Sequence, residues 1–287
     1  MPEFISKLQY KTYERGEFSD EKSRSLEETL QLIKDFPWNQ QRGVDIQPTG
    51  PSVTIQDEYV NYLKIGLYFN GKFCLYYLDS DNHLYEYHTD DLVDACKLVA
   101  DFFGQKLDLS AFEKHFFNVG NQKHFVTQYF EYRIKLSRVL MLTSFLLIIG
   151  IMFSVLDIAF IIKVEEFYLI LLMSSFFGLF GYVLFRIYYN AICNRNNYLQ
   201  ISKGNDIFSF GYDENEITTY NKKDIDTITA CEPKGNRNPN MVSVFEIAFK
   251  GGTSIKFSNM LIPDSAFRNK FPEGTIINGD GSPIWKL

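Results

Sequence analysis

The pattern of apolar and polar residues divides the chain into three parts. Short apolar segments separated by turn residues run up to residue 138 and resume after residue 197. Between them lie two almost uninterrupted apolar runs, Val139–Ile162 and Phe167–Phe185, joined by four residues. A bilayer core about 30 Å thick needs roughly 20 apolar residues in a helix. The pattern therefore predicts a two-helix transmembrane hairpin, with spans at about 139–162 and 167–185.

The N-terminal part is predicted to be an α+β domain over residues 25–121, preceded by a polar arm over residues 1–24. Ser25 and Glu28 form a capping box, and Pro37 ends that helix. Strands are predicted at Val44–Gln47, Ser52–Gln56, Tyr62–Phe69, Phe73–Leu78 and Leu84–His88. Further helices are predicted over Asp90–Phe103 and from a second capping box at Ser110. The expected sheet is an antiparallel meander, because Asn-Gly between two apolar runs favours a hairpin.

Residues 122–197 are predicted to form the transmembrane hairpin with helical stalks on both sides, and residues 198–287 a mostly-β domain. Six or seven short strands are expected there, followed by a short helix over Asp264–Phe271. The strands are predicted at Tyr198–Lys203, Asp206–Gly211, Glu216–Tyr220, Ile225–Cys231, Val244–Lys250 and Ser254–Ser258. Gly- and Asn-containing turns separate most of them.

Small residues in the two apolar runs are candidates for close helix packing, because they let helix backbones approach in lipid. They are Gly150, Ser154, Ser174, Gly178 and Gly181. Asp157 is the only charge within the first run. An ionisable residue in a membrane is a functional candidate, but Asp157 is also placed to reach water or Lys163. A structural role and a role in gating or transport both remain open.

Lys and Arg near the ends of the runs predict the orientation of the hairpin. Arg133, Lys135 and Arg138 precede the first run, and Arg186 and Arg195 follow the second. The start of the chain has no apolar signal region. The four Cys lack the paired spacing of a disulfide framework. We therefore expect a multi-pass inner-membrane protein with both termini in the cytoplasm and with the lipid bilayer as a partner.

Charge and motifs exclude several classes of function. A net charge of −6 and a pI near 5.3 argue against nucleic-acid binding. No phosphate-binding glycine pattern, nucleophile elbow or Cys–His arrangement is visible. His83 and His88 are five residues apart on a strand, so they point to opposite faces and make poor metal ligands. We expect no enzymatic activity, no cofactor and no metal, and the sequence leaves any small-molecule ligand open.

Tyrosines along the predicted meander are the candidate partner surface. Alternate members should face the core, and the others would present rings of a kind favoured in protein interfaces. The candidates are Tyr62, Tyr68, Tyr76, Tyr77, Tyr85 and Tyr87. Ordinary core and surface packing is the alternative interpretation.

The C-terminal third resembles bacterial pleckstrin-homology-like (PH-like) domains found beside transmembrane hairpins. The resemblance rests on the run YLQISKGNDIFSFGYDENEITTYNKKDIDTI, on FEIAFKGGTSIKFSN and on the short helix after them. It implies a binding or assembly module without enzymatic activity. Some relatives bind phosphoinositides through a basic cluster between the first strands, where this sequence has Lys203-Gly204-Asn205-Asp206, so headgroup recognition is not implied.

The acidic, aromatic N-terminal domain is weakly similar to small immunity proteins of bacterial toxin systems. Together these features predict a membrane-anchored, non-enzymatic binding or scaffold protein with two cytoplasmic domains, and an immunity protein against a membrane-acting toxin is a special case. Its partner would be another protein or a second copy in an oligomer. The alternative is a subunit of an oligomeric transport or membrane-signalling assembly.

Overall fold

The computed structural model describes residues 2–42, 48, 50–116, 120–161, 178, 180–182, 184–185, 187–189, 191–192, 194–213, 215–232 and 243–280. The chain forms two compact units. The first comprises Met1–Tyr129 with Ser202–Asn205, and the second comprises Phe130–Ile201 with Asp206–Leu287.

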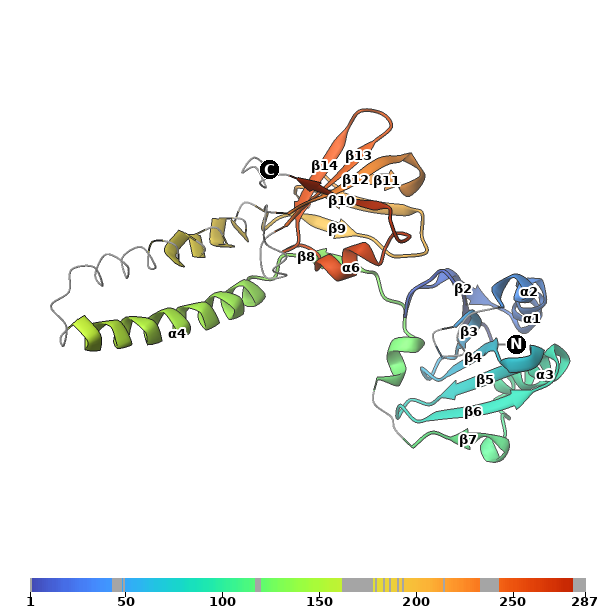
Figure 1. Cartoon of the computed structure of the whole chain (residues 1–287). Coiled ribbons are helices and arrows are strands. Elements are labelled where there is room, and N and C mark those ends of the chain that lie inside the picture. The colour runs from blue at the N-terminus through green and yellow to red at the C-terminus, as the bar shows by residue number, and fades with distance from the viewer. Residues whose placement is uncertain are drawn as a thin grey trace. The chain divides into compact units, whose positions relative to one another are not determined.

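The first unit is built on a seven-stranded antiparallel sheet of order β2-β1-β3-β4-β5-β6-β7 (Figure 1). Its strands are β1 (Phe4–Gln9), β2 (Ser19–Arg24), β3 (Ser52–Gln56), β4 (Tyr62–Leu67), β5 (Phe73–Leu78), β6 (Leu84–Thr89) and β7 (Glu113–Lys114). Its α-helices are α1 (Leu26–Asp35), α2 (Trp38–Gln41) and α3 (Leu92–Phe103). Short 3₁₀ turns lie at Phe69–Gly71, Leu109–Ala111 and Asn121–His124.

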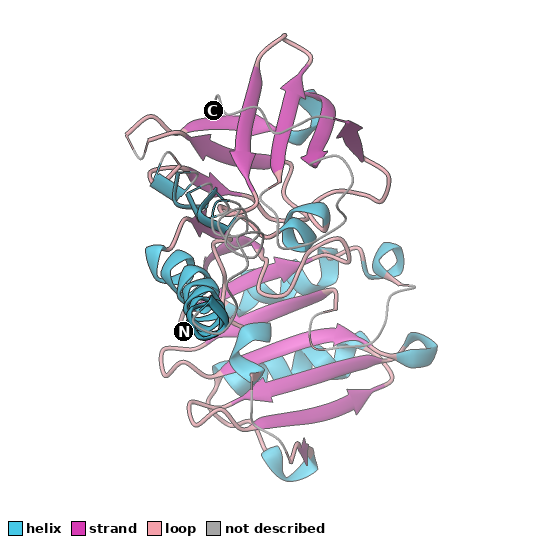
Figure 2. Ribbon diagram, turned by 60° about the vertical axis from the view of Figure 1, so that its left-hand side comes forward, coloured by secondary structure: helices cyan, strands magenta, loops and turns pink. Residues whose placement is uncertain are grey.

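Helices α1 and α3 bury their apolar sides on one face of this sheet. Figure 2 shows helices lying against one face of the strands. Ile33 of α1 and Val99 of α3 are fully buried there beside Leu75 of β5. The predicted capping box is confirmed, since the Ser25 side chain accepts from the Glu28 amide and the Glu28 carboxylate accepts from the Ser25 amide. Strands β3 and β5 have the predicted bounds. The predicted strand Val44–Gln47 lies outside the described residues.

The expected polar arm contains two strands of the sheet instead. Phe4 and Leu8 of β1 pack into the core, but Ser6, Lys7 and Gln9 are also buried. Because these buried polar side chains sit between the apolar ones, β1 lacks the alternation by which a half-buried strand is recognised. Strand β1 lies between β2 and β3 because it pairs with residues that are distant in sequence. The local pattern of apolar and polar residues does not reveal this pairing.

Two predicted helical segments near residues 110–138 are wrong. After the turn at Leu109–Ala111, the chain buries Phe112 and adds β7 to the edge of the sheet at β6. Asp108, and not Ser110, caps that turn. The predicted helical stalk is interrupted by β8 (Glu131–Arg133), which pairs with a strand some 65 residues later. The conformation of both segments depends on pairing with strands that are distant in sequence. Local capping signals carry no information about such pairing.

The second unit has two four-stranded sheets, of order β11-β10-β9-β8 and β14-β13-β12-β15. The further strands are β9 (Tyr198–Gln200), β10 (Ile207–Gly211), β11 (Thr218–Asn221), β12 (Ile225–Glu232), β13 (Val244–Phe249), β14 (Ser254–Ser258) and β15 (Ile276–Asp280). A 3₁₀ turn spans Lys222–Asp224, and α6 spans Asp264–Arg268. Phe245, Phe257 and Phe267 form the centre of the core between the sheets and α6. Strand β15, which pairs parallel with β12, was not predicted.

Helix α4 (Leu136–Ile161) is inserted between β8 and β9. Within the part of the chain that the structure describes, no helix has both the length and the apolar character needed to cross a membrane. This finding contradicts the predicted transmembrane hairpin and the predicted inner-membrane localisation, so both are wrong. The prediction rested on the apolar length of the two runs alone. Residues 162–177, which include the start of the second run, lie outside the described residues. The supported fold class is α+β with mainly antiparallel sheets.

Candidate functional site

Three side chains with metal-binding chemistry meet on the face of the first sheet that lies opposite α1 and α3. Cys74 on β5 is the direct cross-strand partner of His88 on β6, and Glu86 lies two residues before His88. Side chains alternate between the faces of a strand. All three therefore share one face, while Leu75 and Tyr87 point into the helix-covered core.

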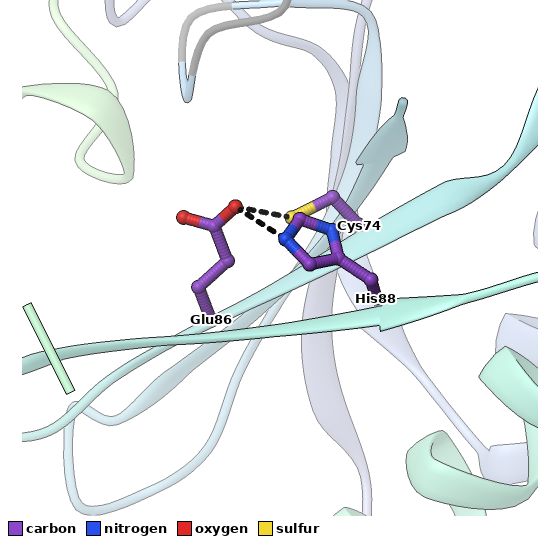
Figure 3. A group of neighbouring side chains, drawn as sticks. All are labelled: Cys74, Glu86 and His88. Atoms are coloured by element: carbon purple, nitrogen blue, oxygen red, sulfur yellow. Dashed lines mark hydrogen bonds and ion pairs between the residues drawn. The ribbon is translucent and has the colours of Figure 1, made fainter. Parts of the chain in front are cut away.

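The carboxylate of Glu86 is the centre of this cluster (Figure 3). Its Oε1 lies 3.4 Å from the Cys74 Sγ and 3.1 Å from the His88 Nε2. The thiol donates to this oxygen. One ligand atom from each of the three residues lies within 4.8 Å of the others. Cys74 is buried, Glu86 is partly buried and His88 is exposed, so the cluster opens from the sheet toward solvent.

A second histidine holds the other oxygen of Glu86. His115 follows β7, and its backbone amide donates to the Leu84 carbonyl. Its Nε2 lies 2.6 Å from the Glu86 Oε2. The Tyr68 ring lies 4.0 Å, centroid to centroid, from the His88 ring. The carboxylate and one imidazole are therefore each held in place by a neighbouring side chain.

The electrostatics of the cluster do not favour a reactive thiolate. Burial raises the pKa of the Cys74 thiol, and the Glu86 carboxylate raises it further, while a hydrogen bond from Tyr76 acts in the opposite direction. Nucleophilic cysteines need a lowered pKa, usually beside a positive charge. The arrangement suits hydrogen bonding or the binding of a cation rather than nucleophilic catalysis.

Two buried lysines lie on the same face of the sheet, nearer to β1. The Lys64 Nζ donates to the Gln9 Oε1 at 2.8 Å and to the His124 carbonyl at 2.9 Å. The Lys7 Nζ donates to the Thr127 hydroxyl at 2.8 Å. Burial lowers the pKa of both amines, and for Lys64 the pKa falls well below its ordinary value. Sequence pattern gave no sign of either, because an isolated lysine in a strand is normally at the surface.

The tyrosines of the candidate partner surface are divided between the two faces of the sheet. Tyr77, Tyr85 and Tyr87 pack against the helix-covered core. Tyr62 and Tyr76 are buried on the other face, with Tyr68 partly buried beside them. All six are at least partly covered by neighbouring side chains. Their role as a partner surface stays a prediction.

The candidate packing residues of the apolar runs have different surroundings. Gly150 of α4 is buried, and a Cβ built there would lie 2.7 Å from the Phe180 Cε1. The Thr143 hydroxyl lies 3.2 Å from the Tyr188 hydroxyl, so α4 contacts the segment near residues 180–188 in antiparallel order. Gly178 and Gly181 have open space around them. Ser174 and the side chains of Ser154 and Asp157 lie outside what the structure describes.

The sequence contained a usable signal for the Cys74 cluster that motif spacing missed. The predicted strands Phe73–Leu78 and Leu84–His88 flank a short turn. Aligning them symmetrically about that turn places Cys74 opposite His88, as observed. His83, in contrast, is paired with Asp79 at 3.0 Å. His115 lies beyond any such local alignment, because it comes 27 residues after His88.

Comparison with known proteins concerns the second unit. Residues 131–270, just under half of the chain, match the family model described as PH domain. No curated protein and no solved structure matches the chain, so the likeness to immunity proteins has no support. The match begins at β8, before the helical insertion, and ends after α6. The two sheets and α6 are therefore a PH-like domain, into which α4 and the following segment are inserted.

Proposed function

We propose that this chain is a non-enzymatic binding protein that self-associates through the exposed apolar side of α4 and so presents its PH-like domains in pairs. The family match supports a binding module, because the matched region is a PH domain. The observation that carries the self-association is the exposure of large apolar side chains along one helix.

These exposed residues follow helical spacing. Ile148, Ile151, Met152 and Val155 are all more than half exposed, at positions i, i+3, i+4 and i+7. They line a groove of about 530 Å³ whose surface is almost entirely apolar. Apolar residues at this spacing share one side of a helix. A contiguous exposed apolar patch of this kind marks an interaction site more often than isolated exposed residues do.

A second copy of the chain is the occupant that best fits this groove. Gly150 and Thr143 of α4 already contact Phe180 and Tyr188 within the chain. They lie seven residues apart, on a different side of the helix from the groove. The described residues that line the groove are all uncharged, so they do not select a partner by opposite charge. A self-complementary apolar stripe is what a two-fold helix–helix interface requires, since the same patch serves both copies.

Sedimentation velocity of the intact chain with Val155→Asp tests the proposal. Val93 on α3 gives a matched control, because it is 64 % exposed and Val155 is 61 % exposed, and both are helical valines. Val155→Asp is expected to weaken dimerisation by at least about tenfold, which corresponds to roughly 1.4 kcal/mol. Val93→Asp should leave the dimer unchanged. A wild-type chain that stays monomeric at all concentrations, or an equal effect of both variants, would overturn the proposal.

A further inference from the structure

The Cys74 cluster carries an inference that does not depend on self-association. We infer that Cys74, Glu86 and His88 bind a divalent transition-metal ion of the zinc type, and that His115 positions the Glu86 carboxylate. Each of the three supplies a different donor atom: a sulfur, an oxygen and a nitrogen.

The distances between the donor atoms fit a metal centre. Typical zinc bonds are about 2.3 Å to sulfur and about 2.0–2.2 Å to nitrogen or oxygen, so tetrahedral ligand atoms lie about 3.4–3.6 Å apart. The Glu86 Oε1 lies 3.4 Å from the Cys74 Sγ and 3.1 Å from the His88 Nε2. The oxygen therefore needs to shift by only a few tenths of an ångström to share a metal with both atoms. The Cys74 and His88 donor atoms also lie within 4.8 Å of each other, so all three sides of the triangle are near the spacing that a metal needs.

The donor set selects the class of metal. Thiolate and imidazole suit zinc and similar borderline ions, whereas magnesium and calcium prefer oxygen ligands alone. When a metal binds, the Cys74 thiol releases its proton to solvent and coordinates as a thiolate. The charges of that thiolate and of the Glu86 carboxylate then balance the charge of the divalent ion. Three protein ligands leave a fourth position on the solvent side, where the exposed His88 lies.

The surroundings provide the supporting contacts that metal ligands usually have. Ligating carboxylates are commonly hydrogen-bonded through their other oxygen, and the His115 Nε2 lies 2.6 Å from the Glu86 Oε2. The Tyr68 ring packs on the His88 imidazole. All three ligands stand on β5 and β6, which both have neighbours on each side in the sheet. Sites on paired strands hold their geometry better than sites on loops.

Titration of the metal-free intact chain with ZnCl₂ by calorimetry, together with absorption spectra after addition of CoCl₂, tests this inference. We expect one zinc ion per chain, and a thiolate-to-cobalt charge-transfer band that disappears when zinc is added. Absence of the band, or zinc binding no tighter than that of a chain lacking all three ligands, would overturn it.

Variants separate the site from adventitious binding. Cys74→Ser, Glu86→Gln and His88→Ala should each weaken zinc binding by at least about tenfold, and His115→Ala by about tenfold, as for other residues that support a ligand. Cys96→Ser and His83→Gln are matched controls, since Cys96 lies on α3 and His83 pairs with Asp79. If the Cys74→Ser variant fails to fold because Cys74 is buried, the His88→Ala variant still tests the site, since His88 is exposed. Equal effects of ligand and control variants would show surface binding only.

Discussion

Replacing the buried Lys64 with methionine should change how the stability of the first unit depends on pH. The Lys64 side chain is about 1 % exposed and lies within 6 Å of the Phe18 and Phe125 rings. Its Nζ donates to the Gln9 Oε1 and to the His124 carbonyl. Methionine has a similar length and does not titrate, so the substitution removes the amine while keeping most of the packing.

The sign of the effect follows from the two pKa values of Lys64. Burial, and then the neighbouring Lys7, lower the pKa of Lys64 in the folded protein well below its ordinary value of 10.5. Between the lowered pKa and 10.5, the unfolded chain binds one more proton than the folded chain does. The wild-type free energy of unfolding therefore rises with pH across this window, by at most about 1.4 kcal/mol per pH unit. The Lys64→Met variant lacks this contribution.

Urea unfolding at several pH values, followed by the fluorescence of Trp38, measures the effect. Trp38 is buried in the core of the first unit, and its Nε1 donates to the Ile33 carbonyl at 2.8 Å. A Trp285→Phe background makes Trp38 the only tryptophan. Lys7 and His124 also titrate nearby. The quantity to follow with pH is therefore the difference in the free energy of unfolding between wild type and variant. The exposed Lys22→Met on β2 is the control. A difference for Lys64→Met that does not change with pH would refute the reasoning.

Three further predictions concern stability and titration. Ser25→Ala removes the α1 cap and should lower the free energy of unfolding of the first unit by about 1 kcal/mol, measured by Trp38 fluorescence; no loss would mean that the cap contributes nothing. Phe267→Ala removes a fully buried ring that contacts three other Phe rings and should cost about 3–5 kcal/mol. Circular-dichroism unfolding of the second unit checks it, and a loss below about 1 kcal/mol would contradict this packing. Burial, and then nearby positive charges, lower the pKa of His124 to about 4. Its NMR titration should therefore have a midpoint near 4 and not near the ordinary 6.5.

Local signals predicted the elements whose structure is decided locally. The Ser25 capping box, the stop before Pro37 and the Asn70-Gly71 hairpin are present. Asn70 and Gly71 both have positive φ values, of 53° and 85°, as a tight hairpin turn between two strands requires. In each case, the residues that determine the conformation lie within a few positions of one another.

Pairing between distant residues decides the elements that were missed. The side chains of Ser6, Lys7 and Gln9 on β1 are buried and bonded to Arg24, Thr127 and Lys64, which are all distant in sequence. Strand β8 forms because β9 pairs with it across the inserted helix. The sequence of a strand with buried polar side chains resembles that of a polar arm. The sequence of a three-residue strand beside an apolar helix resembles a continuation of that helix.

Only part of the candidate metal site could be predicted from the sequence. The pairing of Cys74 with His88 follows from the register of one hairpin, and so does the position of Glu86 on the same face. The contact of His115 with Glu86 depends on β7 joining the edge of the sheet. This pairing belongs to the tertiary structure, and because of it the segment after Ser110 forms a short strand and not the predicted helix.

Site-specific photocrosslinking of the intact chain tests the proposed self-association most directly. A photoreactive amino acid replaces Met152 on α4, or Val93 on α3 as the control, in an equal mixture of ¹⁴N- and ¹⁵N-labelled chains. The account predicts a covalent dimer from position 152 whose crosslinked peptides pair α4 of one isotope with α4 of the other, and none from position 93. Crosslinks that stay within one chain, or dimers formed equally from both positions, would contradict it.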